Sequence, residues 1–217
     1  MKPIVLWGAT GQAKVLRECL DGIYDVVALF DNQESVPSPF DGVPIFHGKA
    51  GFERWRAGNP AAGISFLVAI GGDRGRDRLQ LHEYLAGHGL EPATAIHRTA
   101  FVAGDAELGE GAQVLAMAAV CAGATLGRQT IVNTSASVDH DCKLGQGVHV
   151  APGAHLAGEV TVGDGTMIGT GAIVLPRVVI GADVMVGAGS VVLRDVPDGV
   201  TVFGNPARLI PGRRQPG

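Results

Sequence analysis

The segment around His140 has the residue types of a general base. An imidazole titrates near neutral pH, so His140 can take a proton from an attacking amine or hydroxyl. Such a base needs a carboxylate that orients its ring, and Asp139 and Asp141 flank the histidine. The sequence leaves open which carboxylate bonds the ring nitrogen, and it leaves open an ordinary solvated histidine. The chemistry predicted here is removal of a proton from a nucleophile.

The element that carries His140 has a sequence period of six. Seventeen consecutive positions at this spacing are Ile, Leu or Val. Neither an α-helix nor a two-faced strand repeats apolar residues every six positions, whereas a hexapeptide β-helix does. Three hexads then close one coil of roughly 18 residues, and coils stack about 4.8 Å apart. We therefore predict an all-β parallel β-helix over residues 93–196. Its inward positions are Ile96, Val102, Leu108, Val114, Val120, Leu126, Val132, Val138, Leu144, Val150, Leu156, Val162, Ile168, Val174, Ile180, Val186 and Val192.

Stacking of the coils gives each histidine of the β-helix different neighbours. Residues 18 apart lie above one another, so His140 stacks between Ala122 and Gly158, and the notch around its imidazole can admit a substrate. His149 and His155 stack between larger residues and lack that clearance. No histidine has another 18 residues away, and no pair has an H-x4-H spacing. The sequence therefore predicts no metal site.

The first 92 residues predict a Rossmann-like α/β domain. Apolar runs alternate with helical patterns, which is typical of a parallel sheet that binds ligands at the carboxyl ends of its strands. The expected strands cover residues 3–7, 25–30 and 64–70, and the expected helices cover residues 12–20 and 76–87.

The predicted ligand site of this domain is a nucleotide cleft at those strand ends. Helix N-terminal amides can hold a diphosphate, and Asp31 can bond a ribose or a base. The first turn reads G-A-T-G rather than G-x-G-x-x-G, which argues against a nicotinamide cofactor. The alternative is that its glycines merely turn the chain. The candidate substrate-binding residues are Gly8, Gly11, Gln12, Asp31, Asn32 and Gly72.

Composition limits the partners and the compartment. A net charge of −4 and a pI near 5.9 argue against nucleic-acid binding. The chain has no apolar run of 18 residues and no signal-like N-terminus, so we expect a cytoplasmic protein without membrane insertion. Cys19, Cys121 and Cys142 form no C-x-x-C motif, and we expect reduced, unreactive thiols.

Several short motifs, in order along the chain, resemble those of one enzyme family. Residues 133–142 resemble the N-T-x-x-x-x-x-H-[DE]-C segment of bacterial sialic-acid O-acetyltransferase-like and nucleotide-aminosugar N-acetyltransferases. The other similar segments are residues 8–15 to G-A-G-G-H-[AG]-K-V, residues 70–76 to I-G-x-x-x-x-R, residues 96–100 to I-H-P-S-A, and residues 204–208 to G-N-P-A-[KR]. The first of these departs from the family pattern at Thr10 and Gln12.

The resemblance implies a homotrimer built on a left-handed β-helix, with acetyl-CoA between subunits and a nucleotide-linked sugar in the N-terminal domain. It makes His140 the base and Asp141 its orienting partner, with Asn133 a polar substrate contact beside them. It places His149 near the thioester and pantetheine arm, and Gly158 where that arm passes the backbone. The implied adenine-end contacts are Asn205, Pro206, Ala207 and Arg208. Arg208, Arg213 and Arg214 are candidates for the nucleotide phosphates, unless the basic tail, part of residues 197–217, is only solvated.

We therefore expect an acetyl-CoA-dependent N-acetyltransferase that acts on the C4 amine of a nucleotide-linked 4-amino-4,6-dideoxyhexose. GDP-perosamine or a UDP-linked equivalent is the expected substrate, for surface polysaccharide or glycan assembly. We expect direct transfer, because Cys121 and Cys142 lack an activating environment for an acyl-enzyme. Two alternatives stay open: O-acetylation of sialic acid or a related sugar, and a non-catalytic nucleotide-sugar-binding scaffold subunit.

Overall fold

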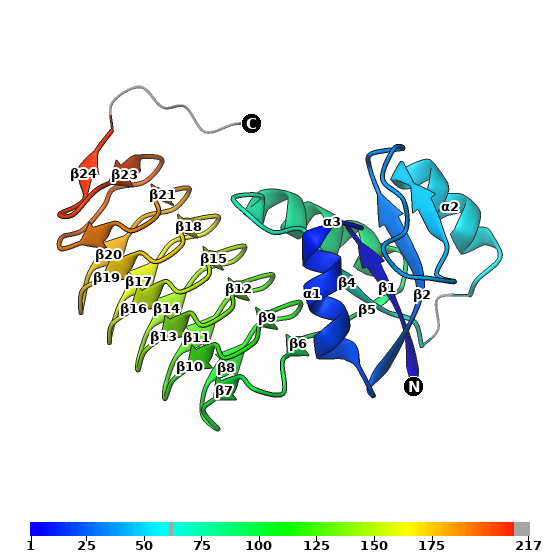
Figure 1. The fold of residues 1–217 in the computed structure, drawn as a ribbon, viewed down its shortest axis with the longest axis horizontal. Coiled ribbons are helices and arrows are strands. Elements are labelled where there is room, and N and C mark those ends of the chain that lie inside the picture. The colour runs from blue at the N-terminus through cyan, green and yellow to red at the C-terminus, as the bar shows by residue number, and fades with distance from the viewer. Residues whose placement is uncertain (61–62, 211–217) are drawn as a thin grey trace.

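The N-terminal part of the computed structural model is a parallel sheet with helices on both faces (Figure 1). The structure describes residues 1–60 and 63–210. Five strands pair in the order β3-β2-β1-β4-β5, all parallel. The elements are β1 Lys2–Trp7, α1 Gly11–Leu20, β2 Tyr24–Asp31, β3 Ile45–His47, α2 Gly48–Ala57, β4 Ser65–Val68, α3 Gly75–Gly87 and β5 Glu91–Pro92.

The sequence predicted β1, β2, β4, α1 and α3 to within two residues at each end, and these elements are confirmed. It missed β3, α2 and the two-residue strand β5. β3 has only three residues, all of them half-buried, so it offers no alternation of buried and exposed positions. α2 contains Gly48 and Gly51, which are poor helix formers, and buries only Gly51, Phe52 and Trp55. Packing on the sheet, rather than local propensity, holds this helix.

Two apolar clusters lie on opposite faces of the sheet. Leu16 and Leu20 of α1 pack with Ile4 and Leu6 of β1, and this cluster also contains Leu115 of the β-helix. Helices α2 and α3 cover the other face, where their side chains cluster around the β1 and β2 aromatics. Helix α1 therefore lies between the sheet and the β-helix (Figure 1).

Residues 95–192 form a parallel β-helix whose two-residue strands each end on one of the seventeen aliphatic positions. The strands form three stacks of parallel neighbours 18 residues apart, as in the pairing of Val120 with Val138. From Val114 to Val192 every one of these positions is buried, which confirms the predicted inward face there. The first three positions differ: Ile96 is 42% exposed, and Val102 and Leu108 are half-buried, because their strands are the terminal strands of the three stacks. The stacks fit the left-handed β-helix that the resemblance implies. The strands are β6 Ala95–Ile96, β7 Phe101–Val102, β8 Glu107–Leu108, β9 Gln113–Val114, β10 Ala119–Val120, β11 Thr125–Leu126, β12 Ile131–Val132, β13 Ser137–Val138, β14 Lys143–Leu144, β15 His149–Val150, β16 His155–Leu156, β17 Thr161–Val162, β18 Met167–Ile168, β19 Ile173–Val174, β20 Val179–Ile180, β21 Met185–Val186 and β22 Val191–Val192.

After the last coil the chain folds back on the β-helix. Strand β23 (Thr201–Phe203) continues the stack that runs from β6 to β21, and β24 (Arg208–Leu209) pairs with it in antiparallel direction.

The corners between these strands share one backbone conformation. Every sixth residue from Gly111 to Gly189 has a positive φ, and half of these positions are not glycine. They include Asp141, with a φ of 59°. Asp and Asn tolerate this left-handed conformation better than most side chains. The repeat therefore fixes the backbone that carries the proposed orienting carboxylate.

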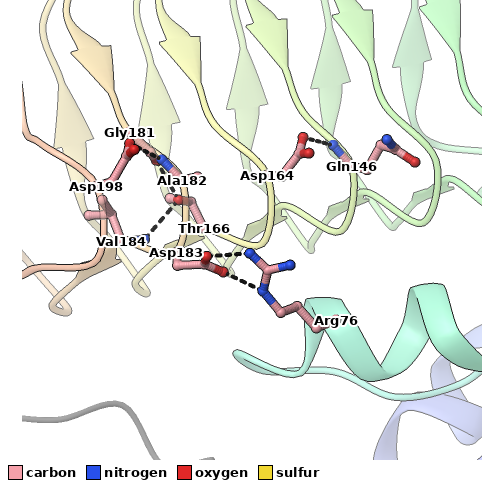
Figure 2. A network of polar contacts seen from close by, with 9 residues as sticks. All are labelled: Arg76, Gln146, Asp164, Thr166, Gly181, Ala182, Asp183, Val184 and Asp198. Atoms are coloured by element: carbon pink, nitrogen blue, oxygen red, sulfur yellow. Dashed lines mark hydrogen bonds and ion pairs between the residues drawn. The ribbon is translucent and has the colours of Figure 1, made fainter.

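Helix α3 attaches the N-terminal part to the β-helix. Arg76 pairs with Asp183 through both carboxylate oxygens, with the Nε–Oδ1 contact at 2.8 Å (Figure 2). In the same view Asp164 and Asp198 accept hydrogen bonds from backbone amides of neighbouring coils, which ties the corners together. Gly75 meets the β-helix so closely that an added Cβ would lie 2.2 Å from the carbonyl oxygen of Gly147. This contact fixes the distance between the two parts.

Candidate active site

His140 and Asp141 form a hydrogen-bonded pair at the corner that follows β13. Nδ1 of His140 lies 2.8 Å from Oδ2 of Asp141, and both side chains are more than half exposed. Asp139 instead accepts a hydrogen bond from the backbone N–H of His140 at 2.7 Å. The geometry therefore resolves the two carboxylates: Asp141 contacts the ring and Asp139 contacts the backbone.

The charges around His140 favour a basic ring. The hydrogen bond to Asp141 raises the pKa of His140 above its ordinary value, and the negative charges of Asp139, Asp141 and Glu159 add to this effect. Since Asp141 accepts from Nδ1–H, the lone pair of the neutral ring is on Nε2. That nitrogen can receive a proton from a bound nucleophile.

Two glycines make room for the pair. A Cβ on Gly158 would lie 2.3 Å from Nε2 of His140, so the imidazole itself rests against the Gly158 backbone. A Cβ on Gly123 would lie 2.7 Å from Oδ1 of Asp141. Each glycine is 18 residues from the side chain it accommodates, as the stacking predicts. The predicted passage of a pantetheine arm along Gly158 stays a prediction.

Asn133 and His149 form a second polar group on the β-helix. The amide Nδ2 of Asn133 lies 3.0 Å from Nε2 of His149, and Nδ1 of His149 lies 3.0 Å from the carbonyl oxygen of Gly72. His149 is only 4% exposed. Burial, and then the positive charge of Arg78, lower the pKa of His149 to about 4. Among the described residues Asn133 thus bonds to His149 rather than to His140, and its predicted place beside the base stays a prediction.

A pocket of about 290 Å³ opens at the carboxyl ends of β1, β2 and β4. Of the predicted substrate residues, Gly8, Asp31 and Asn32 line it. Gly8 has a φ of 110°, and an added Cβ would lie 2.2 Å from the carbonyl oxygen of Ala69, so only glycine fits there. Thr10, Gln33 and Arg74 also line the pocket and were not among the predicted residues. Thr10 and Gln33 are next to predicted residues in the sequence, and Arg74 lies two residues after Gly72. This closeness in sequence was the signal that could have identified them.

Asp31 closes the turns beside this pocket. Its Oδ2 accepts from the backbone N–H of Ala9 and its Oδ1 from that of Gln33, both at 2.9 Å. Gly11 is the first residue of α1 and exposed. The Gln12 amide donates to Oε1 of Gln113 on the β-helix at 2.7 Å. Their predicted contacts with a nucleotide stay predictions.

The C-terminal motif lies beside a second pocket. Ala207 and Arg208 line a cavity of about 380 Å³ together with residues 192–197 and two β23–β24 residues, Val202 and Leu209. Asn205 and Pro206 are exposed next to it. Arg213 and Arg214, predicted to meet phosphates, lie outside the described residues.

Within residues 1–60 and 63–210, no group of three or more His, Cys, Asp or Glu side chains could hold a metal ion. None of the helices in this part of the chain is both long and apolar enough to span a membrane. Burial raises the pKa of the Cys19 and Cys142 thiols to about 11, which disfavours the thiolate. Cys142 is also fully buried.

Comparisons with known proteins give concordant results. The family model described as "Bacterial transferase hexapeptide (six repeats)" matches residues 159–194. No curated protein sequence matches the chain. Among solved structures, PerB from Caulobacter crescentus in complex with CoA and GDP-perosamine is 38% identical, with a TM-score of 0.85 over 97% of this chain and 98% of that chain. The acetyltransferase domain of PglB from Neisseria gonorrhoeae, in complex with acetyl coenzyme A, is 34% identical, with a TM-score of 0.85 over 96% and 99%. WeeI from Acinetobacter baumannii is 27% identical, with a TM-score of 0.83 over 97% and 100%.

Proposed function

The chain belongs to the bacterial hexapeptide-repeat acetyltransferases, and we propose that it transfers the acetyl group of acetyl-CoA to the C4 amine of a nucleotide-linked 4-amino-4,6-dideoxyhexose. GDP-perosamine or a UDP-linked equivalent is the acceptor. The observation that carries this proposal is the His140–Asp141 pair, exposed at a corner with Nε2 available as a proton acceptor. The protein acts in the cytoplasm, and its product serves surface polysaccharide or glycan assembly.

The reaction follows from the orientation of the pair. Nε2 of His140 accepts a proton from the sugar amine as the amine nitrogen attacks the thioester carbonyl carbon. The carbon–sulfur bond then breaks, the amide remains on the sugar, and the imidazolium proton passes to the departing CoA thiolate. Asp141 holds the ring and stabilises its charged form during the step. No residue of the protein is acylated.

We assign the N-terminal part, residues 1–92, as a Rossmann-like nucleotide-sugar-binding domain, residues 93–196 as the acyltransferase β-helix, and residues 197–217 as the tail. The pocket lined by Gly8, Asp31 and Asn32 supports the first assignment, because open parallel sheets bind ligands at such strand ends. Gly11, at the start of α1, offers helix amides to the diphosphate. Gln12, Gly72 and Asn133 complete the proposed substrate-binding set.

The proposed cofactor contacts are Gly158, Asn205, Pro206, Ala207 and Arg208, with the acetyl-CoA sites between subunits of a homotrimer. Large apolar side chains exposed on the β-helix support such an assembly, because a partner surface would cover them. They include Phe101 at 59%, Met117 at 64% and Val179 at 47% exposure.

The test is thiol release from acetyl-CoA, measured with GDP-perosamine, UDP- and dTDP-linked 4-amino sugars, and free sialic acid. We expect release with one nucleotide amino sugar, and loss of that release in His140→Asn. Release with sialic acid alone would assign O-acetylation instead. No release with any acceptor would favour the scaffold alternative, and unchanged turnover in His140→Asn would refute the role of the base.

A further inference from the structure

The carbonyl oxygen of Gly72 joins the nucleotide pocket to the β-helix. Gly72 follows Gly71, a lining residue of that pocket, and has a φ of 70°. Its oxygen lies 3.0 Å from Nδ1 of His149 and 3.4 Å from a guanidinium nitrogen of Arg78. Two side chains, one from α3 and one from β15, therefore meet at one backbone atom of the pocket loop.

The hydrogen bonds determine the tautomer of His149. Oδ1 of Asn133 accepts from the backbone N–H of Thr134 at 2.7 Å, so the amide NH₂ of Asn133 must face His149. Nε2 of His149 therefore accepts and Nδ1 carries the hydrogen. That hydrogen points to the Gly72 carbonyl, which can only accept.

Arg78 anchors the same loop from the other side. Its guanidinium is fully buried and donates to carbonyl oxygens of the N-terminal part, at Ile70 and Gly72, and of the β-helix, at Gln129, Gly147 and Val148. A positive charge beside His149 opposes protonation of that ring. The surroundings thus keep His149 neutral and bonded at both nitrogens.

We propose that His149 is a positioning residue that ties the Gly71–Gly72 loop of the nucleotide pocket to Asn133 of the β-helix, so that nucleotide binding and acetyl transfer share one hydrogen-bonded chain. This inference rests on the proposed function. It differs from a direct contact of His149 with the thioester, because both ring nitrogens already bind protein groups and the side chain is 4% exposed.

The two roles predict different kinetics for His149→Phe, which fills the buried space without hydrogen bonds. A positioning role raises the KM for the nucleotide sugar on the order of 10-fold, the effect of losing a hydrogen bond, and leaves the KM for acetyl-CoA within about 2-fold. A rise in the acetyl-CoA KM alone would overturn the proposal. His155→Gln is the matched control, because His155 is an exposed β-helix histidine that bonds Ser137 of the same stack. It should leave both constants unchanged.

A second measurement needs neither activity nor a folded variant. In ¹⁵N NMR of the wild-type protein we expect the His149 ring as the Nδ1–H tautomer, with no titration between about pH 5 and 8. An Nε2–H tautomer, or titration in that range, would overturn the proposal whatever the kinetics. If the wild-type protein releases no thiol with any acceptor, the proposed function fails, and the NMR result alone then decides on the hydrogen-bonded chain.

Discussion

Replacing Gly158 by alanine is expected to remove activity without unfolding the protein. The new Cβ would lie 2.3 Å from Nε2 and 2.5 Å from Cε1 of His140, whereas ordinary contact begins at 3.4 Å. The ring must therefore retreat by about 1.1 Å. A misplacement of about 1 Å in a catalytic group can cost on the order of 100-fold in rate. We expect kcat to fall by that order.

The stability of the Gly158→Ala variant should barely change. The His140 side chain is 54% exposed, so it can swing into solvent without disturbing the core. Gly158 also has no positive φ that would strain an alanine. We expect the free energy of unfolding to stay within about 0.5 kcal/mol of wild type.

The assay is thiol release at saturating acetyl-CoA and nucleotide sugar, paired with chemical denaturation. Gly104→Ala is the matched control, because Gly104 occupies the same corner position three coils earlier and a Cβ there meets nothing within 4 Å. Wild-type kcat in Gly158→Ala would refute the claim that His140 acts from its observed position. An equal loss in both variants would show that the corners, rather than the imidazole, are sensitive.

Three further predictions concern pH and packing. Activity should fall as the pH falls through the raised pKa of His140, because only the neutral ring accepts a proton. Asp141→Asn removes the main cause of the raised pKa, so the acidic limb of the pH profile of kcat/KM should move to lower pH. An acidic limb that does not move would contradict the pairing of His140 with Asp141. Gly8→Ala should lower the free energy of unfolding, measured by chemical denaturation, by about 2 kcal/mol or more, because the added Cβ would lie 2.2 Å from the Ala69 carbonyl oxygen. A change under about 0.5 kcal/mol would be inconsistent with that contact. The pKa of His149 is about 4 in the folded protein and about 6.5 in the unfolded chain. The stabilisation that the neutral ring gives is therefore fully present above about pH 6.5 and is lost as the pH falls toward 4. In a pH series of denaturation curves this loss should be on the order of 3 kcal/mol, and it should be absent in His149→Phe.

The β-helix could be predicted because its signal is local and repeated. A single aliphatic residue such as Val138 predicts little, but seventeen aliphatic residues at one spacing exclude other sequence periods. In the structure these residues are buried from Val114 to Val192. The positive φ at the corners was not predicted, because positions such as Met117 and Gln129 carry side chains that rarely adopt this conformation. Stacking on neighbouring coils imposes that conformation on them.

The contacts between the two parts could not be predicted for a different reason. His149 meets a carbonyl 77 residues away in sequence, and Gln12 meets Gln113 at a separation of 101. Neither separation is a multiple of the repeat, so no periodicity points to it. The contacts of Arg78 are even harder to predict, because all of its hydrogen-bond acceptors are backbone carbonyls, which every residue has. A fully buried arginine leaves no trace in the sequence that distinguishes it from a solvated one.

The sequence does, by contrast, predict the space around the His140 and Asp141 side chains, because the length of one coil determines which residues lie above and below them. His140 needs a residue without a side chain 18 positions later, and Asp141 needs one 18 positions earlier; Gly158 and Gly123 occupy these places. An imidazole over a residue with a Cβ would be pushed off its corner, and a carboxylate over such a residue could not reach Nδ1. A histidine followed by an acid in a β-helix therefore predicts this pair only when both glycines are present. His155 is followed by Leu156 rather than by an acid, and among the described residues its ring bonds only to Ser137 of its own stack.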